Sequence, residues 1–180
     1  MAGTRYTATA IALHWLSALL IVAAFALGVI MVDMKISPTK LQYFSWHKWL
    51  GITVLGLVAL RLLWRLSHQP PALAATTPRW QLLAAAAGHW ALYLLMFAIP
   101  LSGWAYSSAS GYPVVYLGHL QLPDWVPKDK ALAAQLKEVH ELLTTVLLFV
   151  VGTHLAAALK HQFIDKDGLM ARMWFGRKVS

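Results

Sequence analysis

Histidine is the residue type whose placement in this sequence points most directly to chemistry. The chain has eight histidines and no cysteine. Five of the histidines fall inside long apolar stretches: His14, His47, His89, His140 and His154. Ionisable side chains at such depth are costly and usually mark a functional site. A single one is commonly a neutral imidazole bonded to a neighbouring helix, but five in four stretches indicate a shared role.

The spacing of these histidines predicts two sites, one above the other. His140 and His154 are almost four helical turns apart. On an α-helix, this interval of about 14 residues turns through about 1400°, roughly 40° short of four full turns, and rises roughly 21 Å. One helix therefore offers an imidazole near each membrane leaflet. His47 lies level with His140 and His14 level with His154, so each pair could place a neutral imidazole nitrogen on either side of a haem iron.

The absence of other ligands favours haem over the alternatives. Tetrahedral zinc sites draw three or four ligands together, usually with cysteine or carboxylate, and no such group is visible. Without cysteine there is also no iron–sulfur cluster, thiolate-ligated haem, covalently attached haem or disulfide. One ambiguity remains. His89 lies about as deep as His154, so depth alone would let it replace His14 as a ligand, or it could instead bond a haem propionate.

Four apolar stretches position these residues. They run from about residue 9 to 32, 45 to 66, 82 to 106 and 136 to 161, and a helix needs about 20 residues to cross a bilayer. Hydrophobic residues make up 59% of the chain and charged residues 12%, against about a quarter charged in soluble domains. Backbone in lipid must satisfy its own hydrogen bonds. We expect an all-α membrane protein, a four-transmembrane-helix bundle forming a single domain over residues 1–180, and we detect no internal repeat.

The first stretch could be mistaken for a signal peptide. Arg5 precedes an apolar run, and Ala24-Phe25-Ala26 resembles a cleavage site. The run is about 24 residues, which is long for the apolar part of a signal peptide, and cleavage would remove His14. We expect an uncleaved first span.

The basic residues predict the orientation of the spans. With four spans, both chain ends and the loop at 67–81 share one side, which holds nine of the 15 basic residues, including every arginine. The positive-inside rule therefore predicts cytoplasmic termini. The formal charge of +8 could suggest nucleic acid, but the basic residues lie in loops and tails, where membrane topology needs them. We expect contact with membrane lipid and no nucleic acid.

The assembled segments resemble the bacterial cytochrome b561 family, which is close to the b-type cytochrome subunits of nickel–iron hydrogenases and formate dehydrogenases. The resemblance covers nearly the whole chain, and each segment alone is short. The matching segments are residues 12–16 (ALHWL), 47–51 (HKWLG) with Arg61 and Arg65 beyond, 88–90 (GHW), 136–141 (LKEVHE), 152–154 (GTH) and His161.

The resemblance implies two haem b groups in a bacterial inner (plasma) membrane. Its axial pairs would be His14 with His154 for an inner haem and His47 with His140 for an outer haem, which gives His89 no ligand role. Some members of the family oxidise superoxide on the outer face and reduce ubiquinone, and others dock a hydrogenase or dehydrogenase. This chain is similar to the short, stand-alone members.

Charged residues near these levels are candidates for contacts with the cofactors. Arg61 follows His47 by almost four helical turns and could bind an inner haem propionate instead of reaching the lipid headgroups. Lys137, one turn before His140, could reach an outer propionate or stay solvated. His161, about two turns beyond His154 on nearly the same face, could bond a quinone head group or be a solvated interfacial histidine.

These observations leave three functions to distinguish. The first is a di-haem oxidoreductase that links an outer-face donor, such as superoxide, to the ubiquinone pool. The second is a membrane anchor that relays electrons from a partner dehydrogenase or hydrogenase on the outer face to quinone. The third is a non-redox four-helix scaffold or transporter with polar histidines.

Overall fold

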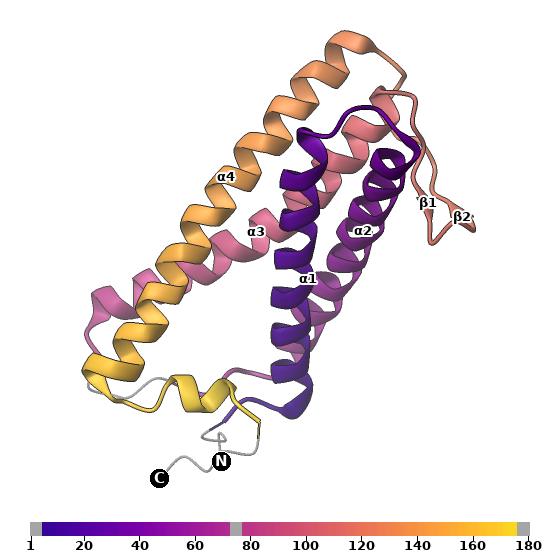
Figure 1. Cartoon of the computed structure of the whole chain (residues 1–180). Coiled ribbons are helices and arrows are strands. Elements are labelled where there is room, and N and C mark those ends of the chain that lie inside the picture. The colour runs from indigo at the N-terminus through magenta and orange to yellow at the C-terminus, as the bar shows by residue number, and fades with distance from the viewer. Residues whose placement is uncertain (1–4, 73–76, 176–180) are drawn as a thin grey trace.

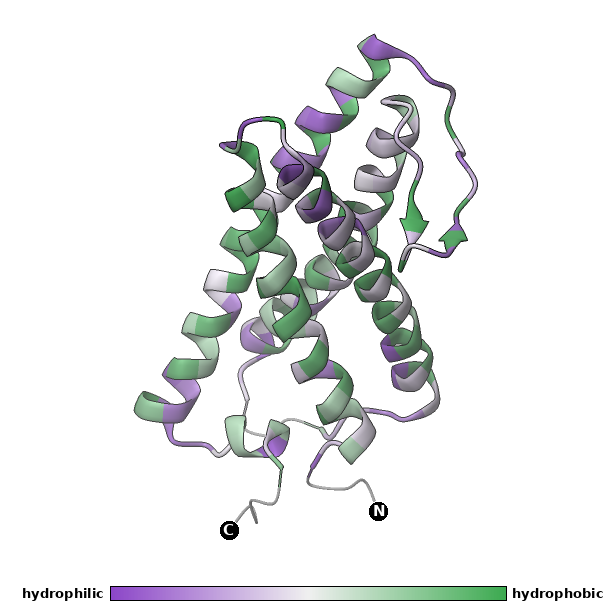
Figure 2. Cartoon of the chain, turned by 45° about the vertical axis from the view of Figure 1, so that its right-hand side comes forward, coloured by the Kyte–Doolittle hydropathy of each residue, from purple (hydrophilic) through white to green (hydrophobic). Residues whose placement is uncertain are grey.

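Four long helices make up most of residues 5–72 and 77–175, which this computed structural model describes (Figure 1). All four are long and apolar enough to cross a membrane, and Figure 2 shows hydrophobic residues along most of their length. The predicted all-α, four-span fold is confirmed. The elements are α1 Ala8–Val32, α2 Pro38–Ser67, α3 Arg79–Ala109 and α4 Lys130–Lys160, followed by a π-helical turn His161–Asp165 and a 3-10 turn Met170–Met173.

All four helices begin before their apolar stretches, and the difference is largest for α2 and α4. α2 starts at Pro38 and not near residue 45, because the Ser37 side chain accepts a hydrogen bond from the backbone N–H of Lys40 at 3.2 Å and proline suits the first helical position. α4 starts at Lys130 and not near residue 136, because the Asp129 carboxylate caps it in the same way. Caps fix these ends, whereas hydropathy locates only the part that crosses lipid.

The helices pack as two hairpins. α1 lies along α2 and α3 along α4, and α2 with α3 forms the contact between the hairpins. The buried core consists of Val54 and Val58 of α2 against Tyr93 and Met96 of α3. Within the described ranges, α4 makes no comparable packing with α1 or α2, and Figure 1 shows the hairpins leaning apart toward the end where the chain starts and finishes.

A short β-hairpin in the α3–α4 loop was not predicted. β1 (Val115–Tyr116) pairs antiparallel with β2 (Leu120–Gln121). Its anchors lie on α2: the Trp49 indole donates to the Val115 carbonyl at 2.7 Å, and the Thr53 and Tyr116 hydroxyls lie 2.9 Å apart. Such short strands cannot show alternating hydrophobicity, so the sequence carried no signal for them.

Both ends of the part of the chain running from residue 5 to 175 lie at one end of the bundle. The Trp15 indole on α1 donates to the Met173 carbonyl at 2.8 Å, and the Tyr6 N–H donates to the Arg172 carbonyl at 3.4 Å. We call this the inner end and the opposite end, which carries the β-hairpin, the outer end, after the predicted sidedness. Arg177 and Lys178, counted in that prediction, lie outside the described residues.

The predicted orientation can be tested by labelling, because the chain has no cysteine of its own. We expect Gln69→Cys, in the α2–α3 loop, to resist a membrane-impermeant maleimide in intact cells and to react after permeabilisation. His119→Cys, in the turn of the β-hairpin, should react in both conditions; both positions are exposed. The reverse pattern would place the termini outside.

Candidate functional site

The outer histidines form a pair between two helices that do not pack closely. The ring centroids of His47 on α2 and His140 on α4 are 6.2 Å apart, with planes at 82°. Nδ1 of His47 lies 2.9 Å from the Ala24 carbonyl on α1, and Nδ1 of His140 lies 3.0 Å from the Ile99 carbonyl on α3. A carbonyl only accepts, so each Nδ1 carries the proton and each Nε2 keeps a free lone pair. Metal-binding histidines are typically fixed in this way.

Each outer imidazole also rests against a glycine of its neighbouring hairpin helix. A Cβ added at Gly103 would lie 3.0 Å from Cε1 of His140, and one added at Gly28 would lie 3.4 Å from Cε1 of His47. Each glycine follows the accepting carbonyl by about one helical turn. The carbonyl orients the ring and the glycine makes room for it. These two glycines were not predicted from the sequence.

The two hairpins repeat one pattern, which was also not predicted from the sequence. Gly28 and Gly103 follow a His-Trp dipeptide, at His14 and His89, by the same interval. On the second helix of each hairpin, that interval again separates His47 from Arg61 and His140 from His154. His89 is thus the counterpart of His14, and Arg61 the counterpart of His154. The repeat lies in the spacing of these residues and not in similar runs of sequence, so sequence similarity between the hairpins does not reveal it.

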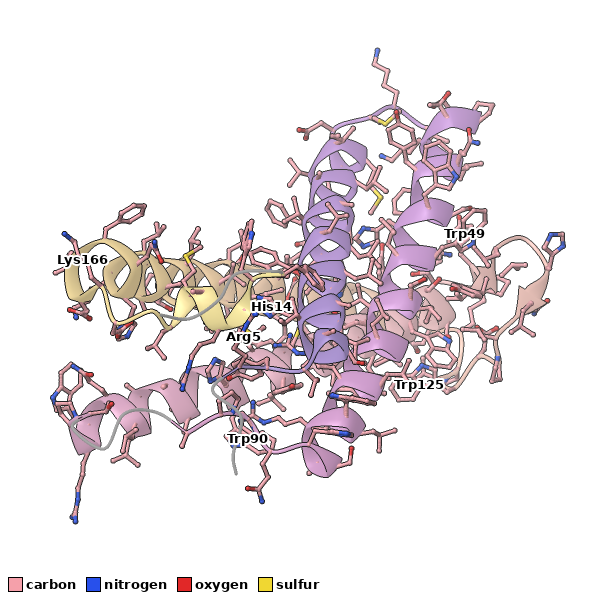
Figure 3. All side chains as sticks on the ribbon, turned by 90° about the horizontal axis from the view of Figure 1, so that it is seen from below. Arg5, His14, Trp49, Trp90, Trp125 and Lys166 are labelled. Carbon is pink, nitrogen blue, oxygen red and sulfur yellow. The ribbon has the colours of Figure 1, made fainter. Side chains whose placement is uncertain are left out.

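The inner histidines form a group of three. The ring centroid of His154 on α4 is 6.4 Å from that of His14 on α1 and 5.7 Å from that of His89 on α3. His14 lies in the interior of the bundle when it is viewed from the inner end (Figure 3). The structure therefore brings His154 close to both His14 and His89, the two candidate ligands that depth in the membrane could not distinguish.

Arg61 lies at the inner group, at the level the sequence predicted. Its Nη2 is 3.0 Å from Nδ1 of His14, and its guanidinium lies 5.5 Å from the centroid of the Tyr93 ring. Guanidinium only donates, so Nδ1 of His14 accepts here and Nε2 carries the proton. Ligation through Nε2 of His14 requires Arg61 to give up this contact for another acceptor, and a carboxylate is the acceptor that arginine binds best.

The remaining predicted residues have other partners. Lys137 pairs with Glu141 on the next turn of α4 at 3.3 Å, with both side chains half exposed, and it lines a cavity described below. His161 lies at the start of the π-helical turn, where Nδ1 is 2.6 Å from an oxygen of Asp167 and 3.1 Å from one of Asp165.

The two histidine pairs fit a porphyrin-bound iron. A metal about 2.0–2.1 Å from one nitrogen of each imidazole, with each nitrogen about 1.1 Å from its ring centre, puts the centroids about 6.2–6.4 Å apart. The separations of 6.2 Å and 6.4 Å match this span, and the 5.7 Å between His89 and His154 is shorter. Both matching pairs join α4 to α1 or α2, the helices it does not pack against, which suits a flat macrocycle between them.

Comparison with known proteins agrees with this site. A family model described as prokaryotic cytochrome b561 matches residues 5–176. The chain is 36% identical to cytochrome b561 homolog 2 of Escherichia coli (strain K12), over 94% of this chain and 90% of that protein. It is 32% identical to cytochrome b561 homolog 1 of the same strain, over 97% and 99%. It is 31% identical to the "Probable superoxide oxidase CybB" of Yersinia pestis, over 94% and 95%.

The four spans and the paired intramembrane imidazoles define a multi-pass membrane protein of the electron-transfer class. The family match over nearly the whole length makes the assignment specific. The chain belongs to the prokaryotic cytochrome b561 family, a membership that implies haem b and a bacterial membrane.

The glycine behind His140 gives a direct test of the outer site. Gly103→Ala puts a methyl group 3.0 Å from the ring, closer than most real contacts, so the imidazole must shift. We expect haem binding at this site to weaken by about 10–100-fold, as for other changes behind a metal ligand, measured as the haem-to-protein ratio.

Two matched variants control for the added methyl group. Gly28→Ala makes an ordinary 3.4 Å contact with His47, and Gly152→Ala on α4 meets nothing within 4 Å. Both should keep the wild-type haem ratio. Equal losses in all three variants would show that helix packing, and not the position of His140, is being disturbed.

Proposed function

We propose that this chain is a di-haem b-type oxidoreductase that takes electrons from superoxide at its outer end and delivers them to ubiquinone at its inner end. His47 with His140 would hold the outer haem, and His14 with His154 the inner one. The observation that carries the proposal is that α4 presents two imidazoles almost four turns apart, each opposed by another at 6.2 Å or 6.4 Å.

Haem bound in these pairs would supply one-electron redox chemistry at two levels of the membrane. The protein's own groups do the rest. The carbonyls of Ala24 and Ile99 hold Nδ1 of the outer imidazoles and leave Nε2 of each ring as the nitrogen that could bind a metal. With a histidine pair as its two protein ligands, a porphyrin iron would have no open position, so the chemistry would be electron transfer and not oxygen binding.

Arg61 would bind a propionate of the inner haem, and His89 would be a second polar neighbour of that haem. Turning Arg61 from Nδ1 of His14 to a carboxylate frees the tautomer that His14 needs for ligation. The shorter 5.7 Å separation of His89 from His154 favours His14 as the ligand.

A cavity at the outer end favours an anionic donor. It has a volume of about 290 Å³ and lies beside the first turns of α4, the helix that carries His140. Three lysines line it: Lys128, Lys130 and Lys137. A hollow lined by one sign of charge concentrates a small ion of the opposite sign and raises its encounter rate.

The relative whose printed name is "Probable superoxide oxidase CybB" supports superoxide as that anion. Two superoxide ions would give up one electron each and leave as two molecules of oxygen. Lys137 would thus act on the approaching donor and not on an outer propionate, since its side chain faces this cavity while paired with Glu141.

At the inner end, ubiquinone would take up these two electrons and two protons to give ubiquinol. His161 would relay the protons: with Nδ1–H donating to Asp167, its Nε2 would take a proton from water and pass it to a quinone oxygen. The acidic pair at Asp165 and Asp167 would return protons to the imidazole. The inner end would face the cytoplasm of a bacterial inner-membrane protein.

The assignment of ligands predicts a pattern across five single substitutions. His47→Ala or His140→Ala should lose one haem, His14→Ala or His154→Ala should lose the other, and each purified protein should retain one haem. His89→Ala should keep both and shift the potential of the inner one. The measurements are the haem-to-protein ratio and the reduced-minus-oxidised spectrum.

The reverse result at two positions would overturn the inner pair. If His89→Ala lost a haem while His14→Ala kept both, His89 would be the axial partner of His154.

Superoxide as donor can be tested with a pulse of the radical given to the purified, oxidised protein. We expect haem reduction faster than the dismutation background, and slower reduction as salt is added. Lys128→Gln with Lys130→Gln should slow it about tenfold at low salt, whereas Lys35→Gln, in the other outer loop, should not. Reduction no faster than the background would reject superoxide, and equal rates in the lysine variants would reject the cavity as the entry point.

A further inference from the structure

A second cavity, of about 60 Å³, lies at the inner end of the bundle. It is bounded by the start of α1, the last turns of α2, Tyr93 of α3 and Met173 near the end of the described chain. Its basic lining residues are Arg5, Arg61, Arg65 and His68, and no carboxylate is among the described residues that line it.

The sequence offers these arginines no internal counterion. Asp33, at the outer end of α1, is the sole acidic residue among the first 123. Of the two acidic residues at the inner end, Asp165 is 2.5 Å from Lys160 and Asp167 is 2.6 Å from His161. The positive charge of the cavity is therefore not neutralised by these carboxylates.

Two guanidinium groups at this cavity contact the same aromatic ring. Those of Arg61 and Arg65 lie 5.5 Å and 5.9 Å from the centroid of the same Tyr93 ring, which is buried. The ring face offsets part of the repulsion through cation–π attraction. Two partly buried guanidinium groups beside one ring make the local potential positive, which favours an anion as ligand.

Arg5 adds an unused donor. Its Nη2 donates to the Trp174 carbonyl, but its Nε is buried and has no hydrogen-bond partner. Buried N–H groups are nearly always satisfied, so an orphaned one in a cationic cavity indicates a missing acceptor. Arg5 precedes α1 at the inner end of the bundle, where Figure 3 labels it.

We propose that this cavity binds a phosphate group, with Arg5 and Arg65 as its main ligands and His68 at the rim. Phosphate offers three acceptor oxygens to several guanidinium donors, where a carboxylate offers two. The cavity lies at the end of the membrane spans, where the headgroups of anionic phospholipids are found and where basic pockets between helices bind them. The phosphate could belong to such a lipid or be free in solution.

Arg61 is excluded from the main ligand set because it is one turn deeper and contacts His14. The proposal therefore stands apart from the assignment of the haem ligands. A haem propionate that reached Arg65 would compete with it, and the experiment is designed to separate the two.

The test is native mass spectrometry of the haem-loaded protein, purified in neutral detergent and stripped of lipid. The probes are phosphatidylglycerol, phosphatidylcholine with the same acyl chains, and inorganic phosphate. We expect one phosphatidylglycerol to bind in preference to phosphatidylcholine. Arg65→Gln should weaken this binding about fivefold or more, and Arg79→Gln, the same charge loss at an exposed position outside the cavity, should not.

The outcomes separate the possible sources. Displacement of the lipid by millimolar inorganic phosphate would identify free phosphate as an equal ligand of the same site. Equal lipid binding by Arg65→Gln and Arg79→Gln would overturn the proposal. Loss of a haem in Arg65→Gln with lipid binding unchanged would also overturn it, since the arginine would then hold a propionate. If Arg65→Gln does not fold, Arg5→Gln gives the same comparison.

Discussion

The hydrogen bond from a ring nitrogen to a helix carbonyl is the interaction on which the outer site depends. Carbonyls inside a membrane helix normally accept only from the backbone one turn further on, so a side chain that shares one needs close access. Gly28 and Gly103 give this access to His47 and His140. The bond also decides the tautomer, and with it which nitrogen is left for a metal. The orientation of the outer imidazoles is thus set by α1 and α3, two helices that carry neither of these histidines.

The histidine pairs span the part of the interior where the helices pack least. The core of Val54, Val58, Tyr93 and Met96 lies on α2 and α3 between the two histidine levels. Above and below it, α4 is joined to α1 and α2 mainly through imidazoles. In this family, bound haem would complete the contact between the hairpins. Because haem would bind the folded protein and not the unfolded chain, the free energy of unfolding should rise with haem content.

Sequence reasoning predicted those features that have a strong periodic or chemical signal. Apolar length located the four helices, and the cost of burying histidine singled out the residues that now lie in pairs. It could not predict the first turns of α2, because a cap at Ser37 and not hydropathy sets that end. Nor could it distinguish His14 from His89, which lie at one depth on different helices but differ in their distance from His154 and in the contact of His14 with Arg61. The two glycines behind the outer rings were hidden among others common in membrane helices.

The repeated hairpin has a consequence for the direction of electron flow. At the outer level the two hairpins contribute like residues, His47 and His140. At the inner level the first hairpin has an arginine where the second has His154. This difference places a positive charge beside the inner histidines, and a nearby cation favours the state with one more electron. In the proposed function, Arg61 would therefore raise the potential of the inner haem and favour electron transfer toward the inner end.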